Sequence, residues 1–252
     1  MGKRILFIAT GGTIASRKGE AGLHPALAAQ DLLAALPDKL PPDVQVVCRQ
    51  LYKIDSTDIE PQHWQKLAKE IFTAYDDFTG FVVAHGTDTM AYTASALTFM
   101  LENLGKAVIL TGSQLPVEES GSDAGENLMT AFLAAASGQP GVYIAFDGRL
   151  IEGCAARKVY RARRGAFLSV NRQAAGYRAK AVVCWTKSRK TNAGTLMLRT
   201  ELDTAVAMLY LMPGSPVEIL RLLADKGCHG IIIAGYGAGV VPAAYLLLRK
   251  DA

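Results

Sequence analysis

Short, continuously apolar runs alternate along this chain with longer segments of helical periodicity, and this alternation constrains the fold more than any other feature. Apolar runs without polar alternation are typical of strands buried on both faces, as in parallel sheets. Strand–helix alternation therefore predicts an α/β fold with right-handed crossovers. Helical patterns begin at Pro61 and cover residues 92–104 and 126–136. The predicted strands are residues 4–9, 44–48, 80–85, 107–110, 142–146, 181–185, 205–211 and 230–234.

A polar segment at residues 187–204 is the best candidate for a linker between two domains. Residues 1–186 are predicted to form an α/β domain with a parallel sheet, flavodoxin-like or Rossmann-like, and helices on both faces. Residues 205–252 are predicted to form a strand–helix–strand unit with a last apolar helix, and a Ser-Pro-Val-Glu capping box at residues 215–218 is expected to open its first helix. Because so small a unit buries little apolar surface, we expect an incomplete C-terminal α/β domain that packs on the first domain or on another subunit, or that is part of something larger.

Composition excludes several classes of protein. Apolar residues make up 50% of the 252 residues and charged residues 20%, as in ordinary globular domains. The longest unbroken apolar run, residues 205–212, is far shorter than the ~20 residues of a membrane span. The net charge of +4 does not demand a nucleic-acid partner.

The four cysteines lie far apart in the sequence, with no Cys-x-x-Cys spacing. This spacing predicts neither a metal site nor a disulfide framework, and it fits a reducing compartment. The apolar run near the N-terminus is too short for the core of a signal peptide. We therefore expect a cytoplasmic protein.

Four loops that follow predicted strands are rich in hydroxyl and carboxylate side chains. Ligands of open α/β sheets bind outside the carboxyl ends of the strands, so these loops are the expected place for a site. Each loop alone also fits a glycine turn or a helix cap, and His85 alone fits a structural hydrogen-bonding residue as well as a base. The loops are Thr-Gly-Gly-Thr at residues 10–13, Asp-Ser-Thr-Asp at 55–58, His-Gly-Thr-Asp-Thr at 85–89 and Thr-Gly-Ser-Gln at 111–114.

Residues 157–164 form a strongly basic segment that contains one lysine, Lys158. A solvated loop is its simplest interpretation, and a nucleic-acid site is disfavoured because no aromatic platform accompanies it. A threonine hydroxyl is a weak nucleophile that needs a nearby base, which a desolvated lysine oriented by an aspartate can supply. The glycine-rich run at residues 235–239 imitates a dinucleotide loop, but no strand with an acidic residue follows it.

Two of these motifs, together with their flanks at residues 9–15 and 83–90, resemble the two signatures of bacterial cytoplasmic (type I) L-asparaginases. The resemblance covers most of residues 5–171 and, more loosely, residues 206–242. It implies an amidohydrolase that converts L-asparagine to L-aspartate and ammonia through an acyl-threonine, without metal or cofactor. It also implies a homodimer or homotetramer if the C-terminal domain is complete in the native protein, with no nucleic-acid or membrane partner.

The resemblance implies a role for each matching residue. Thr13 would be the nucleophile that attacks the side-chain amide carbon, and Thr87, Asp88 and Lys158 would form a second hydroxyl–carboxylate–amine set. Ser56 and its two neighbours would hold the α-carboxylate of the substrate, and Asp88 would face its α-ammonium group. The residues implied for substrate binding are Asp55, Ser56, Thr57, Thr87 and Asp88.

Two features depart from the family pattern. The loop at residues 16–25 has no tyrosine, and Leu23 or His24 stands near the place where family members often carry one. The C-terminal domain is much shorter than that of the family, which predicts a fragment or a shortened chain. Val240 stands where an asparagine is often found.

These departures keep other functions open. One is a truncated, inactive relative that binds an amino acid or a full-length partner, and another is a glutaminase-type amidohydrolase. A nucleotide-binding α/β protein is a weaker alternative. A tRNA-dependent amidotransferase subunit shares the motifs but is expected to carry an extra N-terminal module, whereas the first predicted strand here begins by Arg4.

Overall fold

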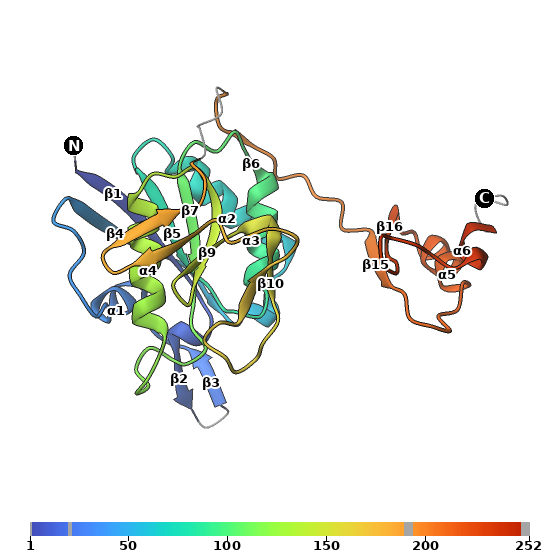
Figure 1. Ribbon diagram of the computed structural model, residues 1–252, viewed down its shortest axis with the longest axis horizontal. Coiled ribbons are helices and arrows are strands. Elements are labelled where there is room, and N and C mark those ends of the chain that lie inside the picture. The colour runs from blue at the N-terminus through green and yellow to red at the C-terminus, as the bar shows by residue number, and fades with distance from the viewer. Residues whose placement is uncertain (1, 20–21, 189–193, 248–252) are drawn as a thin grey trace. The chain divides into compact units, whose positions relative to one another are not determined.

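The computed structural model describes residues 2–19, 22–188 and 194–247, and the chain forms two compact units, Met1–Thr200 and Glu201–Ala252 (Figure 1). The expected linker, residues 187–204, includes residues 189–193, which lie outside the described residues. No helix in the described part of the chain is both long enough and apolar enough to cross a membrane.

The larger unit is built on an eight-stranded sheet in the order β13-β12-β9-β8-β7-β5-β1-β4. Its parallel part consists of β4 (Val44–Ile54), β1 (Lys3–Gly11), β5 (Gly80–Ala84), β7 (Ala107–Thr111) and β8 (Gly141–Phe146). Its antiparallel part consists of β9 (Arg149–Glu152), β12 (Gly176–Ala179) and β13 (Val182–Trp185). The α/β fold class with a mostly parallel sheet is confirmed. The strand expected at residues 181–185 forms, but it is an antiparallel edge strand with Val182 exposed.

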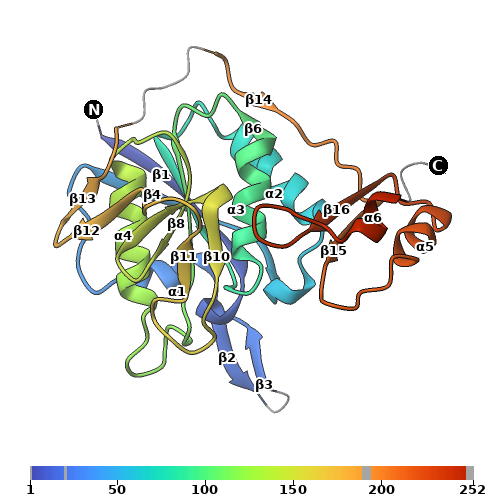
Figure 2. The same cartoon turned by 45° about the vertical axis from the view of Figure 1, so that its right-hand side comes forward.

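Side chains of the central strands alternate between two apolar cores, one on each face of the sheet. Leu6 and Ile8 of β1 belong to the core under α2 (Pro61–Thr73) and α3 (Met90–Met100). The intervening Phe7 belongs to the core under α1 (Ala29–Ala34) and α4 (Ala124–Ala136), where its ring lies 5.2 Å from the ring of Phe132. Both faces are therefore covered by helices, which explains why these strands are continuously apolar (Figure 2).

Helix α3 carries no charged residue along its whole length. Its inner face packs into the first core through residues such as Ala94 and Leu97. Its outer face exposes Tyr92 by 65% and Phe99 by 70%. A helix that is apolar on all sides is normally buried. The outer face of α3 is exposed, so it forms an apolar surface on the larger unit.

Short elements outside the main sheet were not predicted from the sequence. They are the hairpin of β2 (Ser16–Gly19) and β3 (Gly22–Pro25), the pair β10 (Ala156–Lys158) and β11 (Phe167–Ser169), the pair β6 (Leu101–Glu102) and β14 (Met197–Leu198), and the 3-10 turns η1 (Thr13–Ala15), η2 (Ser56–Asp58) and η3 (Gly153–Ala155). The helix expected at residues 92–104 ends at Met100, because Leu101 and Glu102 pair with β14.

The smaller unit contains a two-stranded parallel sheet of β15 (Val206–Tyr210) and β16 (Gly230–Ala234), with α5 (Ile219–Asp225) and α6 (Ala243–Leu247). The expected helix start at residues 215–218 is wrong. Helix α5 begins at Ile219, and the Ser215 hydroxyl accepts a hydrogen bond from the Met212 backbone N–H at 2.8 Å instead of capping the helix. A local turn has therefore replaced the capping box.

Replacing Phe132 with alanine is expected to lower the free energy of unfolding by about 3–5 kcal/mol, because it opens a cavity in a fully buried core. Urea unfolding followed by tryptophan fluorescence measures this loss. The matched control is Phe99→Ala on the exposed face of α3, where the same truncation should change stability by less than about 1 kcal/mol. Equal losses in the two variants would contradict the assignment of the core.

Candidate active site

The four hydroxyl-rich loops follow four strands that are neighbours in the sheet, β4, β1, β5 and β7. Hydroxyl groups at the carboxyl ends of these strands tie one strand to the next. Thr10 Oγ1 donates to the Ala84 carbonyl at 2.9 Å, and Thr111 Oγ1 donates to the Ala145 carbonyl at 2.9 Å. The loops predicted from the sequence are therefore brought to one edge of one sheet.

Glycines allow these loops to touch through their backbones. A β-carbon on Gly12 would lie 2.2 Å from Gly86 Cα, and one on Gly86 would lie 2.6 Å from the side chain of Ser56. A β-carbon on Gly112 would lie 2.3 Å from the carbonyl oxygen of His85. Gly12 also has a φ of 79°, which disfavours any other residue. The residues that precede Thr13 and Thr87 are thus in direct contact.

Thr13 is the first residue of η1 and is partly exposed. The turn is closed by the Gly12 carbonyl, which accepts from the Ala15 N–H at 3.0 Å and from the Ser16 hydroxyl at 2.9 Å. Ile14 and Ala15 are buried behind it. The threonine therefore sits on a fixed turn with its side chain accessible.

Thr87, Asp88 and Lys158 form a hydrogen-bonded set. Lys158 is the last residue of β10, and its Nζ donates to Thr87 Oγ1 at 2.6 Å and to Asp88 Oδ1 at 2.8 Å. Thr87 is buried, the Lys158 side chain is 16% exposed, and the Asp88 side chain is 60% exposed. The amine is thus held against a buried hydroxyl by a carboxylate that faces solvent.

Asp55, Ser56 and Thr57 form the turn after β4. Asp55 Oδ1 accepts from both the backbone N–H and the hydroxyl of Thr57, each at 2.9 Å. Ser56 is buried, and its carbonyl accepts from Thr89 Oγ1 at 2.7 Å. This bond ties the loop after β4 to the loop after β5.

His85 is fully buried and has two hydrogen-bond partners. Its Nδ1 lies 2.7 Å from the Gly86 carbonyl oxygen, and its Nε2 lies 2.9 Å from Thr93 Oγ1. Burial lowers the pKa of His85 to about 4, so the ring is neutral at physiological pH. The sequence left open whether His85 is a base or a structural hydrogen-bonding residue, and these contacts favour the structural role.

The basic segment at residues 157–164 is anchored through two of its backbone carbonyls and through the Arg164 side chain. Gln114 Nε2 donates to the Arg161 carbonyl at 2.9 Å and to the Arg163 carbonyl at 3.1 Å, and Arg164 Nη2 donates to the Gly121 carbonyl at 2.9 Å. Gln114 lies in the loop after β7, so this loop holds the segment that supplies Lys158. The sequence indicated Gln114 only as part of a polar loop.

The loop after Thr13 is the β2–β3 hairpin, and residues 20–21 at its tip lie outside the described residues. Arg17 pairs with Glu118 through two nitrogens, with Nη2 2.6 Å from Oε1 and Nε 3.0 Å from Oε2. The guanidinium of Arg17 lowers the pKa of Glu118. His24 lies opposite Arg17 in the hairpin.

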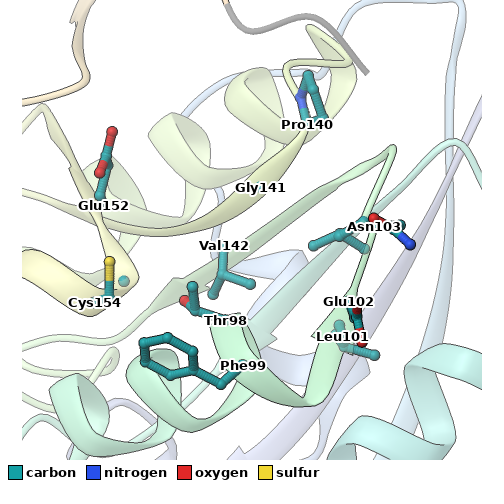
Figure 3. A pocket seen from close by; sticks show the side chains of 12 residues that line it. Thr98, Phe99, Leu101, Glu102, Asn103, Pro140, Gly141, Val142, Glu152 and Cys154 are labelled. Atoms are coloured by element: carbon teal, nitrogen blue, oxygen red, sulfur yellow. The ribbon is translucent and has the colours of Figure 1, made fainter. Parts of the chain in front are cut away.

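A cavity of about 430 Å³ lies at the other end of the strands and contains none of the predicted site residues. It is formed where α3 ends, where β8 begins and where η3 follows β9, with Thr98 and Phe99 on one side and Cys154 on the other (Figure 3). The 11 residues of α3 separate it from the His-Gly-Thr-Asp-Thr loop by about 16 Å. Chemistry at the carboxyl ends of the strands therefore does not use this cavity.

Within the described residues, no three His, Cys, Asp or Glu side chains gather into a group able to hold a metal ion. The four cysteines are free thiols. What the strand ends do bring together is hydroxyl, carboxylate and amine groups.

The chain matches the family model described as asparaginase, N-terminal, over residues 4–191. It is 40% identical to the L-asparaginase of Thermococcus kodakarensis, covering 95% of this chain and 73% of that protein. The solved structure of that thermostable enzyme matches with a TM-score of 0.89 at 39% identity, again over 95% of this chain and 73% of that chain.

Two further relatives are 36% identical to the chain. L-asparaginase 1 of Escherichia coli matches over 99% of this chain and 76% of its own length. A glutamyl-tRNA(Gln) amidotransferase polypeptide of Pyrococcus furiosus matches over 95% of this chain and 57% of its own length. The chain thus spans about three quarters of the length of the two L-asparaginases.

Acidification is expected to destabilise the fold through His85. The folded state holds this ring neutral with a pKa of about 4, whereas an unfolded histidine has a pKa near 6.5. The contribution of the neutral ring to folded-state stability is therefore fully present above pH ~6.5. This contribution, on the order of 3 kcal/mol, is lost as the pH falls toward 4. Urea unfolding of the wild type and of His85→Asn between pH 8 and pH 4 isolates this contribution.

The control for this measurement is His24→Asn in the exposed hairpin, which should keep the full wild-type loss of stability. A pH dependence in His85→Asn that matches the wild type would show that the ring is not held neutral.

Proposed function

The chain belongs to the asparaginase family, and from this premise we propose that its nucleophile is Thr13 and that Thr87, Asp88 and Lys158 assist it. The reaction is the hydrolysis of L-asparagine to L-aspartate and ammonia. Hydrolysis through an acyl-threonine is typical of this family. The proposal assigns the steps of this chemistry to individual residues.

In the first step the Thr13 hydroxyl oxygen forms a bond to the side-chain amide carbon of asparagine. The carbon–nitrogen bond breaks, ammonia leaves with the hydroxyl proton, and an aspartyl ester on Thr13 remains. Backbone N–H groups of the glycine-rich loops stabilise the negative charge that develops on the carbonyl oxygen. In the second step water attacks the ester carbon. The ester bond to Thr13 breaks, which releases aspartate and restores the Thr13 hydroxyl.

The observation that carries the proposal is the contact of Lys158 Nζ with both Thr87 Oγ1 and Asp88 Oδ1. In its amine form Lys158 takes up the proton of the attacking Thr13 hydroxyl through Thr87 and returns it to the departing ammonia. Asp88 orients the amine and stabilises the ammonium that forms in between. The contact of Gly12 with Gly86 supports the joint action of the two threonines, because each threonine follows one of these glycines.

Asparagine carries both an α-carboxylate and an α-ammonium group, so its site needs groups of both kinds. We assign the α-carboxylate to the turn formed by Asp55, Ser56 and Thr57, where the Ser56 hydroxyl can donate to it and the bonds of Thr57 to Asp55 hold the turn. We assign the α-ammonium to Asp88, whose side chain is 60% exposed. The Thr89–Ser56 bond supports this assignment because it ties the two loops together.

We also propose that residues 1–186 form the catalytic domain and that residues 187–204 link it to a partial C-terminal α/β domain at 205–252. The protein is cytoplasmic, and it is a homodimer or homotetramer if the C-terminal domain is complete in the native protein. Every proposed site residue lies before residue 187. The free cysteines support a reducing compartment.

Thr13→Ala is expected to abolish ammonia release from asparagine while leaving the circular dichroism spectrum and melting temperature close to wild type. Thr13 lies on a partly exposed turn outside both cores, so its loss removes the nucleophile and little packing. Thr13→Ser is the matched variant, and it should retain activity because a hydroxyl remains. Ammonia release by Thr13→Ala near the wild-type rate would overturn the assignment.

Lys158→Met is expected to lower kcat on the order of 10²- to 10⁴-fold, because it removes the base and keeps the length of the side chain. Arg157→Met on the same strand is the control, since that side chain points to solvent and its guanidinium is not a base near neutral pH. Steady-state ammonia release measures both variants. A larger loss in Arg157→Met than in Lys158→Met would show that the wrong basic residue has been chosen.

A further inference from the structure

Trp64, Thr93 and His85 form a buried chain of hydrogen bonds that the proposed chemistry does not use. Trp64 Nε1 lies 3.0 Å from Thr93 Oγ1, and Thr93 Oγ1 lies 2.9 Å from His85 Nε2. At the far end of the ring, His85 Nδ1 lies 2.7 Å from the Gly86 carbonyl oxygen. Thr93 and His85 are both fully buried, and Trp64 is partly buried.

The chemistry of the donors and acceptors fixes the direction of these hydrogen bonds. The Gly86 carbonyl can only accept, so Nδ1 of the neutral ring carries the proton and Nε2 is an acceptor. The Thr93 hydroxyl therefore donates to Nε2, and its oxygen accepts from the Trp64 indole N–H, which can only donate. Every donor has one acceptor, and the direction runs from Trp64 through Thr93 and His85 to Gly86.

The last bond acts on the peptide group that precedes Thr87. The Gly86 carbonyl and the Thr87 N–H belong to one planar unit and point in opposite directions, so fixing the carbonyl fixes the N–H and the start of Thr87. Glycine has no side chain, so the Gly86–Thr87 peptide could rotate more freely here than after any other residue type, and the bond from His85 restrains it. Gly86 cannot be replaced by a bulkier residue, because a β-carbon there would lie 2.6 Å from Ser56.

We infer that Trp64, Thr93 and His85 are positioning residues that lock the Gly86–Thr87 peptide and thereby hold the Thr87 hydroxyl against Lys158. The inference rests on the proposed role of Thr87. This chain of hydrogen bonds from Trp64 to Gly86, the relay, begins on α2, passes through α3 and ends in the loop after β5. It therefore connects two helices of one core to the site. Because the hydrogen bonds of the relay end at Gly86 and none of them is made to Thr13 or to the Asp55–Thr57 turn, its loss should affect turnover more than substrate binding.

Thr93→Val tests the inference, because it keeps the shape of the side chain and removes the hydroxyl. We expect kcat for asparagine to fall on the order of 10- to 100-fold, the cost of a small misplacement of a reacting group. We expect KM to stay within about threefold, since the groups assigned to the α-carboxylate and the α-ammonium, the Asp55–Thr57 turn and Asp88, make no hydrogen bond to the relay. Thr93→Ser restores the hydroxyl and should recover most of the lost kcat.

The matched control is Thr98→Val on the same helix. The Thr98 hydroxyl donates only within its own helix, to the Ala94 carbonyl at 2.8 Å, and lies outside the relay. Trp64→Phe should lower kcat less than Thr93→Val, and the double variant should be no slower than Thr93→Val alone, because Trp64 acts through Thr93. If Thr93→Val fails to fold, Trp64→Phe replaces it as the decisive variant, and an unchanged kcat in that variant overturns the inference.

The ¹⁵N resonances of His85 in substrate-free enzyme give a readout that does not depend on catalysis. We expect a protonated Nδ1 and an unprotonated Nε2 in the wild type, and a changed Nε2 resonance in Thr93→Val but not in Thr98→Val. If Thr13→Ala stays active while these resonances behave as expected, the proposed nucleophile is wrong and the relay stands. If Thr93→Val and Thr98→Val have the same kcat, or if Thr93→Ser fails to recover the loss, the positioning role is overturned.

Discussion

A β-carbon has no room where the loops after β1, β5 and β7 meet, and the arrangement of the strand ends depends on this constraint. Gly12 touches Gly86, and Gly112 touches the carbonyl of His85, so backbones lie where side chains would normally separate them. The loops can then present hydroxyl groups from different strands to one small volume. Parallel strands supply the geometry, because their carboxyl ends share one edge of the sheet.

Buried hydrogen bonds keep these contacts in one arrangement. Thr10 and Thr111 tie neighbouring strands together, and Thr89 ties the loop after β5 to Ser56. In a buried, low-dielectric setting an unpaired polar group is costly, so each of these bonds penalises alternative loop positions. The side chains that face substrate can therefore be partly exposed while their backbones are held from behind, as a preorganised site requires.

The sequence was most informative where burial on both faces leaves a continuous apolar signal, which is why the parallel strands and the loops that follow them could be predicted. It was least informative for the antiparallel extension and the short pairs. Strands such as β9 and β12 contain arginines, and they are held by hairpins with β8 and β13 and by pairing with each other. At residues 215–218 a local turn outcompeted the capping box. The partners of His85 were also missed, since Trp64 and Thr93 meet it only after α2 and α3 pack together.

The position of β4 at the end of the sheet has a consequence for self-association. An edge strand of 11 residues leaves a long row of backbone groups open to pairing with another chain, which is a common origin of aggregation. In β4 this edge carries Arg49 and Lys53, the first paired with Glu70 and the second donating to the Ala26 carbonyl at 2.9 Å. Charged side chains anchored beside the open edge disfavour the addition of a foreign strand. The sheet can therefore have a long unpaired edge strand and still resist pairing with a strand of another molecule.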